Sequence, residues 1–365
     1  MAGSLQTEIL GTVFKVTERY TDLWVKGLAA SGLLCPAYDR IMQQPVTLRK
    51  ISRPFYARSY SRNAFHEIVS LKHLRHSNVS IHHSLCTAAA DKIGYRQDLR
   101  YVVSESSGPK LGQIMGTGRL DHIFTTYFLY QILVRLKYLH SASLYHCDLQ
   151  PADILVNEIA DLKIGNLDLD GLNPWPTCSC FIHHYQAPEV ILLCQQLDPA
   201  VDIFSTGCIL GEIFRGSAVF AGEDLRHQLE LFVDILGSSP EQMLEDIRDK
   251  KTLSIIESLS KQSSHCSPHF RAFTMLYPNT MMPYLSEKGH ESDTSIVVNL
   301  LEKILTSDPQ GRLAASKALA HSHLARYYDP TDEPVAHRIS ERLLVNARLP
   351  GNPWEKMFVV ALHTW

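Results

Sequence analysis

The chain has 365 residues, of which 45% are hydrophobic, and its 35 basic and 38 acidic side chains leave a formal charge of −3. This length exceeds one compact domain of about 100–200 residues, so we expect two lobes. The balanced charge argues against a nucleic-acid surface, and no apolar run approaches the roughly 18–20 residues of a membrane span. The eight scattered cysteines predict reduced thiols in an intracellular protein without a structural metal.

Short β-rich runs alternate with small residues over Gly11–Ala37, and the segment GLAASG lies between two of these runs. The pattern predicts a strand–turn–strand that binds nucleotide, in which Gly27, Ala29 and Gly32 let backbone N–H groups approach phosphate oxygens. Leu34 follows on the second strand as a further nucleotide-binding residue. An ordinary hairpin turn is the alternative, because Ala29 places a methyl group where the backbone should come closest.

The next predicted strand, Pro45–Ile51, carries Arg49 and Lys50, which must point to opposite faces because strand side chains alternate. Glu67 lies on a predicted helix, Ser61–Leu74. A strand cation and a helix acid can pair and hold phosphates, so Arg49 and Glu67 are candidates for the nucleotide site. A surface ion pair is the alternative.

Further elements follow along the chain. Val79–Leu99 is poorly patterned and predicts a loop with a short strand, whereas Arg100–Glu105 is a strand. Ser106–Pro109 is expected to be a hinge. Apolar residues at helical spacing predict a long buried helix over Thr125–His140, and another apolar helix opens at Val201.

The stretch of chain from Leu144 to Asp170 contains two polar clusters separated by two apolar strands. The strands are predicted at Ile154–Val156 and Leu162–Ile164, so a hairpin would bring both clusters to one end. Acids, amides and a histidine gathered at one end of a hairpin predict a site for metal and phosphate. The clusters are His146, Asp148 and Asp153 before the hairpin, and Asn166, Asp168 and Asp170 after it.

These clusters resemble the catalytic loop and the metal-binding loop of protein kinases, H-R-D-x-x-x-x-N and D-F-G. The A-P-E element that ends at Glu189 and the D-x-x-S-x-G element that begins at Asp202 resemble the helical lobe of the same fold. In that family the glutamate pairs with an arginine like Arg312, and the aspartate braces the catalytic loop. The segments GTVFKVTERYTDL and AHSHLARYYDPTDEPVA are similar to the stress-activated MAP kinases, most of all to the high-osmolarity-glycerol branch of fungi.

The resemblance implies the bilobal α+β protein kinase fold. A small β-rich N-lobe would span residues 20–105 and a larger helical C-lobe 106–324, between an N-terminal extension over 1–19 and a docking segment and tail over 325–365. It also implies ATP and Mg²⁺ as cofactors if the protein is active. The implied partners are a MAP kinase kinase and proteins with docking motifs, for a monomer of the cytoplasm and nucleus.

Several residues that would touch phosphate depart from the kinase pattern. Asp148 keeps the place of the catalytic base, but Cys147 replaces the arginine of H-R-D and Gln150 replaces the lysine that contacts the transferred phosphate. Arg49 stands at the position of the strand lysine, where its longer, forked guanidinium is not an equivalent group. These changes predict weakened phosphoryl transfer.

The predicted metal ligands are rearranged. Asp153 stands where the family has asparagine, Asn166 where it has the aspartate of D-F-G, and Asp168 where it has the glycine. The first two changes leave the summed ligand charge unchanged, and Mg²⁺ gains most from charged oxygen ligands. Two hypotheses therefore stay open: a catalytically impaired protein that acts through docking or scaffolding, and an atypical active serine/threonine kinase.

The activation loop and the docking acids are the last two features that the resemblance implies. Thr177 and Ser179 occupy the ends of the T-x-Y motif, so the tyrosine is missing, and an ordinary loop threonine is the alternative reading of Thr177. The acids Asp329, Asp332 and Glu333 resemble the common docking site for basic peptides, with a solvated charged turn as the alternative. In the family, arginines bind the activation-loop phosphates. At the matching positions this chain has Asn63, His66, Cys147 and Gly171 in place of arginine.

Overall fold

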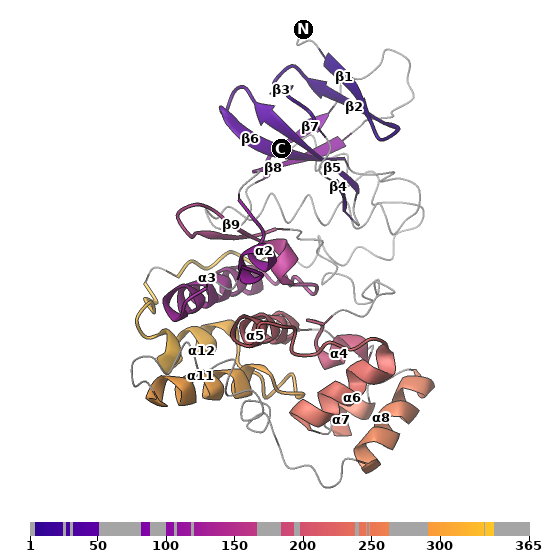
Figure 1. The fold of residues 1–365 in the computed structure, drawn as a ribbon, viewed down its shortest axis with the longest axis vertical. Helices are drawn as coiled ribbons and strands as arrows, with labels where there is room; N and C mark the ends of the chain where they lie inside the picture. Colours follow the sequence, from indigo (N-terminus) through magenta and orange to yellow (C-terminus); the bar gives the residue numbers. More distant parts are fainter. Residues whose placement is uncertain are drawn as a thin grey trace. The chain divides into compact units, whose positions relative to one another are not determined.

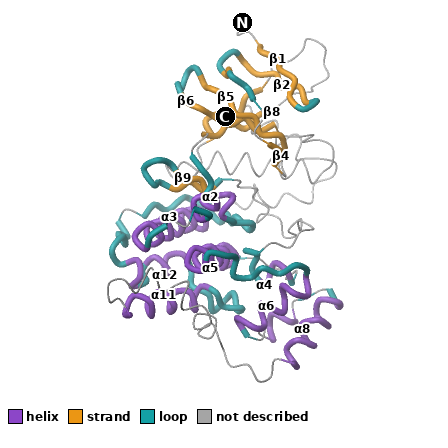
Figure 2. Tube along the Cα trace, viewed as in Figure 1, coloured by secondary structure: helices purple, strands orange, loops and turns teal. Residues whose placement is uncertain are grey.

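The computed structural model describes most of the chain in separate stretches. They are residues 4–24, 27–29, 32–50, 82–87, 100–105, 108–117, 120–165, 184–192, 198–237, 241–245, 247, 249–262, 291–331 and 333–338. The chain divides into two compact units, one with residues 1–108, 165–168 and 339–365, the other with 109–164 and 169–338. Most strands belong to the first unit and most helices to the second (Figures 1 and 2). The division into extension, lobes and tail stays a prediction.

The first unit is built on an antiparallel six-stranded sheet with the order β3-β5-β6-β8-β7, in which β4 also pairs with β5. A separate hairpin, β1–β2, lies within the residues that the sequence analysis treats as an N-terminal extension. The strands are β1 (Ser4–Ile9), β2 (Thr12–Thr17), β3 (Tyr20–Thr21), β4 (Gly27–Ala29), β5 (Gly32–Asp39), β6 (Gln44–Lys50), β7 (His82–Thr87) and β8 (Arg100–Glu105).

The core of this unit lies between the hairpin and one face of the sheet. Alternate residues of β5 and β6, such as Cys35 and Leu48, point into it, as strand geometry requires. Phe14 on β2 stacks on Tyr101 of β8 with 5.5 Å between ring centroids, and the Tyr101 hydroxyl accepts a hydrogen bond from the Lys15 N–H at 2.8 Å. The hairpin is thus part of the same hydrophobic core as the sheet.

Lys50 lies on the core face of β6, where its ammonium contacts residues of β2. Its Nζ donates to the Val13 carbonyl at 2.9 Å and lies 5.9 Å from the centroid of the Phe14 ring. Burial lowers the pKa of its ammonium. The expectation that Arg49 and Lys50 point to opposite faces is confirmed, and Lys50 cannot serve as a substitute for the strand cation at Arg49.

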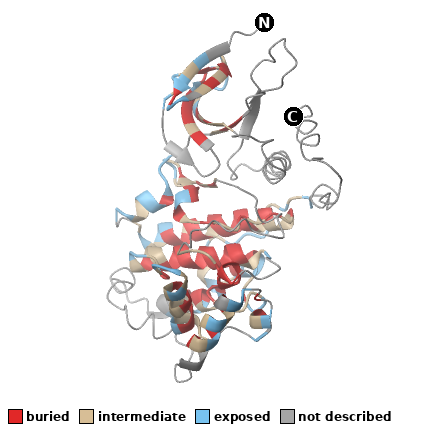
Figure 3. Cartoon of the chain, turned by 90° about the vertical axis from the view of Figure 1, so that its right-hand side faces the viewer, coloured by how far each residue is buried: buried red, intermediate tan, exposed pale blue. Residues whose placement is uncertain are grey.

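The second unit is a set of helices around α3 and α5, both of which are buried along most of their length (Figure 3). α3 packs on α5, on α12 and on the short strand β10. The helices are α2 (Leu111–Met115), α3 (His122–Ser141), α4 (Pro188–Ile191), α5 (Ala200–Arg215), α6 (Leu225–Leu236), α7 (Glu241–Glu245), α8 (Lys250–Gln262), α11 (Glu291–Ile304) and α12 (Ala315–Leu319). Two 3₁₀ helices, η1 (Pro151–Asp153) and η3 (Ser322–Leu324), and the strands β9 (Ile154–Val156) and β10 (Leu162–Ile164) complete it.

Most predicted elements within the described residues are confirmed. The long helix predicted over Thr125–His140 begins three residues earlier, because the Asp121 carboxylate accepts from the Phe124 N–H at 2.8 Å and caps it. The predicted helix Ser61–Leu74 lies outside the described residues. In the described part of the chain we find no helix with the length and hydropathy of a membrane span.

Candidate active site

The hairpin predicted at the centre of the sequence is confirmed residue for residue. β9 and β10 pair antiparallel, with Ile154 opposite Ile164 and Val156 opposite Leu162. Asp153, the last residue of η1, therefore lies at the same end of the hairpin as Gly165. Asn166 and Asp168 follow Gly165 in sequence but lie outside the described residues.

The loop before this hairpin is held by Asp202 at the start of α5. Its carboxylate accepts hydrogen bonds from the backbone N–H groups of His146, at 2.9 Å, and Cys147, at 2.8 Å. The His140 ring contacts the same carboxylate, with 2.8 Å between Nε2 and Oδ2. Asp202 is fully buried. The predicted bracing of the catalytic loop is confirmed.

The electrostatics of Asp202 match this role. Burial by itself raises the pKa of the carboxyl, but the contact with His140, the charges of His140 and His146 and the backbone hydrogen bond outweigh it and hold the pKa below its ordinary value. The acid is therefore a permanent anion at neutral pH. His146 is buried beside it, as expected of a structural core histidine.

Cys147 and Asp148 follow in the loop that Asp202 holds. Cys147 has φ of +63°, a left-handed conformation that few non-glycine residues adopt. Such backbone conformations persist where surrounding contacts fix them, and here the N–H of Cys147 is fixed by Asp202. Asp148, the predicted catalytic base, is half-buried on this loop.

Asp153 is the predicted metal ligand that the structure describes. Its side chain is buried, and its backbone N–H donates to the Gln150 carbonyl at 2.9 Å within η1. A carboxylate oxygen is the donor that Mg²⁺ prefers, so the chemistry of Asp153 fits that ion. Within the residues that the structure describes, no three His, Cys, Asp or Glu side chains form a metal-binding group.

The predicted nucleotide-binding residues of the first unit share one face of its sheet. Leu34 on β5 pairs with Arg49 on β6, and Gly27 on β4 pairs with Leu34. Ala29 pairs with Gly32 at the other end of β4. The face that carries Leu34 and Arg49 is opposite to the core face, so an apolar side chain and a cation lie side by side there, and their nucleotide-binding role stays a prediction. Glu67 lies outside the described residues.

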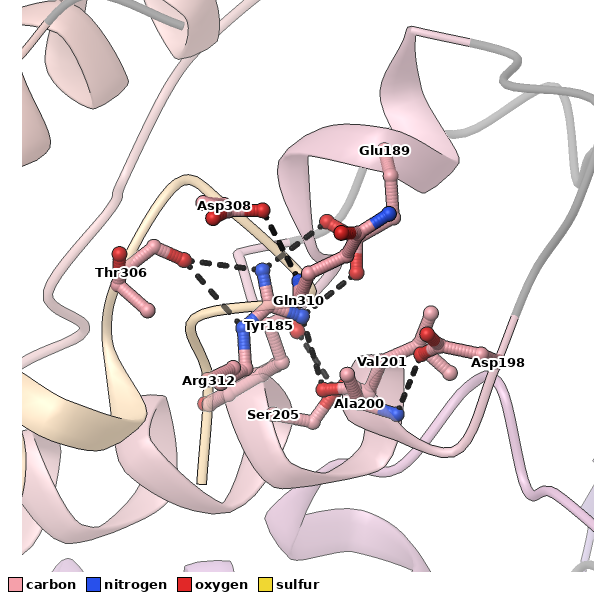
Figure 4. A network of polar contacts seen from close by, with 10 residues as sticks. All are labelled: Tyr185, Glu189, Asp198, Ala200, Val201, Ser205, Thr306, Asp308, Gln310 and Arg312. Carbon is pink, nitrogen blue, oxygen red and sulfur yellow. Dashed lines mark hydrogen bonds and ion pairs between the residues drawn. The ribbon is translucent and has the colours of Figure 1, made fainter. Parts of the chain in front are cut away.

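A buried ion pair joins α4 to the segment after α11 (Figure 4). Arg312 donates to both carboxylate oxygens of Glu189, at 2.6 and 3.1 Å. The same guanidinium donates to the carbonyls of Ala200 and Thr306, at 2.8 and 2.9 Å, and lies 5.0 Å from the centroid of the Phe204 ring. The pairing predicted for Glu189 and Arg312 is confirmed.

Tyr185 ties the chain before α4 to α5 (Figure 4). Its carbonyl accepts from the Ser205 hydroxyl at 2.8 Å, and its own hydroxyl donates to Glu212 at 2.6 Å. Burial, and then the hydrogen bond to Glu212, raise the pKa of the tyrosine far above its ordinary value. Tyr185 and His140 were not among the predicted site residues. Tyr185 lies two residues before the A-P-E element, and His140 is the last residue of a predicted helix; these positions are the only signals in the sequence that could have suggested them.

The predicted docking acids have different environments. Asp329 is exposed, and its Oδ1 accepts from the N–H and the hydroxyl of Thr331, at 2.9 and 2.6 Å. The Glu333 carboxylate is buried and lies 2.7 Å from the Lys137 ammonium of α3. Asp332, and the activation-loop residues Thr177 and Ser179, lie outside the described residues.

Comparison with known proteins supports the architecture. The family model described as "Protein kinase domain" matches residues 27–324. The chain is 38% identical over 358 residues to the mitogen-activated protein kinase hog1 of Blastobotrys adeninivorans, a match that covers 98% of this chain and 83% of that protein. It is also 38% identical to the mitogen-activated protein kinase HOG1 of Arthrobotrys oligospora, over 98% of this chain and 95% of that protein. HOG1 of Saccharomyces cerevisiae is 38% identical, over 97% of this chain and 75% of that protein.

These matches agree with the fold and with the confirmed contacts. A β-sheet unit and a helical unit with a braced loop after α3 make up the mixed α+β protein kinase fold that the sequence analysis expects. The chain therefore belongs to the protein kinase family and, within it, to the mitogen-activated protein kinases that are similar to HOG1.

Proposed function

We propose that this protein is a signalling component of a fungal stress cascade of the osmotic type, with impaired phosphoryl transfer, that acts by docking to other proteins of the cascade. The observation that carries the proposal is that some contacts typical of kinases are present and others are not. The contacts that brace the catalytic loop are kept, whereas the side chains that would touch ATP and its metal are replaced.

The contacts that brace the catalytic loop, and the buried pair that joins α4 to the segment after α11, require several groups at once. Asp202 must accept from two backbone N–H groups and from His140, and Glu189 must meet Arg312 in a buried pair. Buried charges of this kind are costly unless fully paired, so a chain that needed no defined loop would have little physical reason to keep them. Their presence supports a protein that uses its kinase-like surface.

The replaced contacts bear on the reaction itself. In the kinases, a lysine holds the ATP phosphates, a second lysine contacts the transferred phosphate and an asparagine positions the metal; here these places hold Arg49, Gln150 and Asp153. Removing one group that stabilises a transition state typically costs about 10²–10³ in rate. Three or more such changes together would leave little turnover.

The proposed partners are an upstream MAP kinase kinase and proteins with basic docking motifs. Asp329 is exposed, and Asp332 carries a second acidic side chain in the same segment. The three relatives reported above are named as mitogen-activated protein kinases, which supports an assignment to such a cascade. We propose a monomer in the cytoplasm and nucleus.

An atypical active serine/threonine kinase is the second candidate, and the position of Asp148 favours it. This acid is half-buried on a loop that Asp202 holds, where it would accept the proton of a substrate hydroxyl. ATP would supply the γ-phosphoryl group, and Mg²⁺ would neutralise its developing charge. Arg49 would contact the phosphates, and Asp153, Asn166 and Asp168 would hold the metal.

A thermal-shift titration of the full chain with ATP, with and without Mg²⁺, tests the two candidates. A ligand that binds only the folded state raises the melting temperature by mass action. Impaired transfer predicts a small shift or one that does not depend on Mg²⁺. A large shift that requires Mg²⁺, together with phosphate transfer to a docking-motif substrate, would refute the impairment and establish the active kinase.

A restored variant tests the cause of the impairment. Arg49→Lys, Asp153→Asn, Asn166→Asp and Asp168→Gly together rebuild the family pattern at the strand cation and at the predicted metal ligands, while Gln150 is left as it is. We expect this variant to gain docking-dependent kinase activity that the parent lacks. A folded variant that binds Mg²⁺–ATP and still transfers no phosphate would show that these four positions do not account for the loss.

A further inference from the structure

α3, which packs on β10 of the β9–β10 hairpin, carries a fully buried arginine. Arg135 has no exposed surface and donates from Nη1 to the Gln131 carbonyl at 2.6 Å and from Nη2 to Gln131 Oε1 at 3.0 Å. Gln131 is one turn earlier on the same helix and is also buried. A guanidinium in the core is rare, because burying a charge is expensive.

The side-chain amide of Gln131 is bonded at both ends to the turn of the hairpin. Its Nε2 donates to the Ala160 carbonyl at 2.9 Å, and its Oε1 accepts from the Leu162 N–H at 2.9 Å. Leu162 is the first residue of β10, opposite Val156 of β9. The amide therefore fixes the start of β10 on α3.

Only one orientation of this amide satisfies its surroundings. Oε1 accepts from Leu162 and from Arg135 together, so a flipped amide would bring its NH₂ group against two donors. The Ala160 carbonyl opposes the flip as well, because it would then face Oε1. Arg135 thus reinforces the orientation in which Gln131 holds the hairpin.

We propose that Arg135 is a positioning residue for the predicted metal site, acting through the Gln131 amide to set the register of the β9–β10 hairpin on α3. Asp153 immediately precedes β9. A hairpin that slides or tilts on α3 would move Asp153 with it. The step from the hairpin to the metal rests on the second candidate function, an active kinase that binds Mg²⁺, but the hold on the hairpin does not.

The charge of Arg135 indicates a role other than stability. Burial lowers the pKa of the guanidinium to about 9, although the charge of Asp161 opposes that shift. The group is thus charged at neutral pH in a site that disfavours charge. A buried ion pair can often be replaced as a whole by apolar residues at little cost in stability, so burial of a charge is weak evidence of a stabilising role.

Hydrogen–deuterium exchange of the full chain without nucleotide tests the hold on the hairpin. We expect Arg135→Met to keep a melting temperature close to that of the parent while the Leu162 amide exchanges about tenfold faster. Gln131→Leu should accelerate the same amide, and the double variant should exchange no faster than Gln131→Leu alone, because both changes break one connection. Lys137→Met, a charge removal on the same helix whose ammonium contacts Glu333, is the control and should leave Leu162 unchanged.

Two results would overturn the proposal. One is unchanged Leu162 exchange in a folded Arg135→Met variant; the other is acceleration by the two changes that is additive in free energy, since independent effects would then be at work. If Arg135→Met fails to fold, Gln131→Leu and Arg135→Lys, which keeps a charge but lacks the forked donors, decide the same question.

Binding of Mn²⁺ with ATP, followed by electron paramagnetic resonance, extends the test to the metal. If the parent binds Mn²⁺–ATP, Arg135→Met should bind it at least several-fold more weakly, and equal affinity would refute the link to the metal site. If the parent binds none, the proposed metal role of Asp153 fails, whereas the exchange experiment still decides whether Arg135 holds the hairpin.

Discussion

The Lys137 ammonium lies 2.7 Å from Glu333 Oε2. The Glu333 carboxylate is buried in this contact and is therefore not part of the exposed acidic docking surface that the sequence predicts. Two more contacts hold the chain that follows: the Ala336 N–H donates to the Ser141 hydroxyl at 2.8 Å, and Arg338 Nε donates to the Ser143 hydroxyl at 2.9 Å. Residues 333–338 are thus fastened to the end of α3 and to the chain just after it.

This geometry separates two acids that the sequence treats as equivalent. We expect Glu333→Gln to lower the melting temperature by a few degrees, since it leaves the Lys137 ammonium without its buried anion. Asp329→Asn should instead leave stability almost unchanged and weaken a basic docking peptide, because Asp329 is exposed. Calorimetric binding of such a peptide at two salt concentrations, with thermal melts of both variants, checks the distinction. Equal loss of peptide affinity in both would refute it.

The second prediction concerns Asp202, which holds the backbone of the catalytic loop. Asp202→Asn keeps the shape but replaces one accepting oxygen by a donor, which faces either a backbone N–H or His140. We expect a loss of about 3 kcal/mol in the free energy of unfolding. Chemical denaturation measures it, and faster amide exchange at Cys147 should accompany it. A loss below about 1 kcal/mol would contradict the bracing role.

The depressed pKa of Asp202 sets the pH range of this effect. The ordinary value is 3.8, and the folded state holds the carboxyl below it. The stability that it contributes is therefore fully present above pH 3.8 and is lost as the pH falls through the lower folded-state pKa. The difference in unfolding free energy between parent and Asp202→Asn should therefore shrink as the pH falls through that acid range.

Much of the fold and part of the site were predictable because they rest on local pattern. The β9–β10 hairpin has its predicted bounds, since two short apolar runs with polar residues between them permit few other structures. The partners of Asp202 and Glu189 were implied by the resemblance of their motifs to those of protein kinases, and not by local pattern.

Other features depend on contacts between distant residues, which no local pattern encodes. Glu333 lies in an acidic run typical of solvent-exposed turns. Its carboxylate is nevertheless buried, and it pairs with Lys137, 196 residues earlier in the chain. The buried helix over Thr125–His140 was predicted, but the contact of Arg135 with the Gln131 amide was not. Sequence periodicity gives the face of a helix but not what packs on that face.

The buried pair of Glu189 and Arg312 gives a third prediction. Glu189→Ala leaves a guanidinium uncompensated among Phe204 and the carbonyls of Ala200 and Thr306, and should cost about 3–5 kcal/mol. The paired change Glu189→Leu with Arg312→Met removes both charges. We expect the double variant to be more stable than Glu189→Ala, as denaturant unfolding would show. A double variant that is worse than the single would mean that the charges themselves stabilise the fold.

The last prediction concerns the contact between α5 and the end of α11. A methyl group built on Gly207 would lie 2.5 Å from Ile304 Cγ2 and 2.8 Å from two atoms of the Leu305 side chain. Because the glycine is inside α5, alanine would gain helix propensity, roughly 0.5–1 kcal/mol. Overpacking a core typically costs about 1–3 kcal/mol, so the clash should win.

We therefore expect Gly207→Ala to destabilise the protein by about 1–2 kcal/mol in equilibrium unfolding. Gly116→Ala is the matched control, because a methyl group there meets only carbonyl oxygens at 3.5 and 3.6 Å, which is ordinary contact. It should change stability by less than about 0.5 kcal/mol. If Gly207→Ala were as stable as this control, α5 and α11 would have room to separate, and the close approach at Gly207 would not be required for packing.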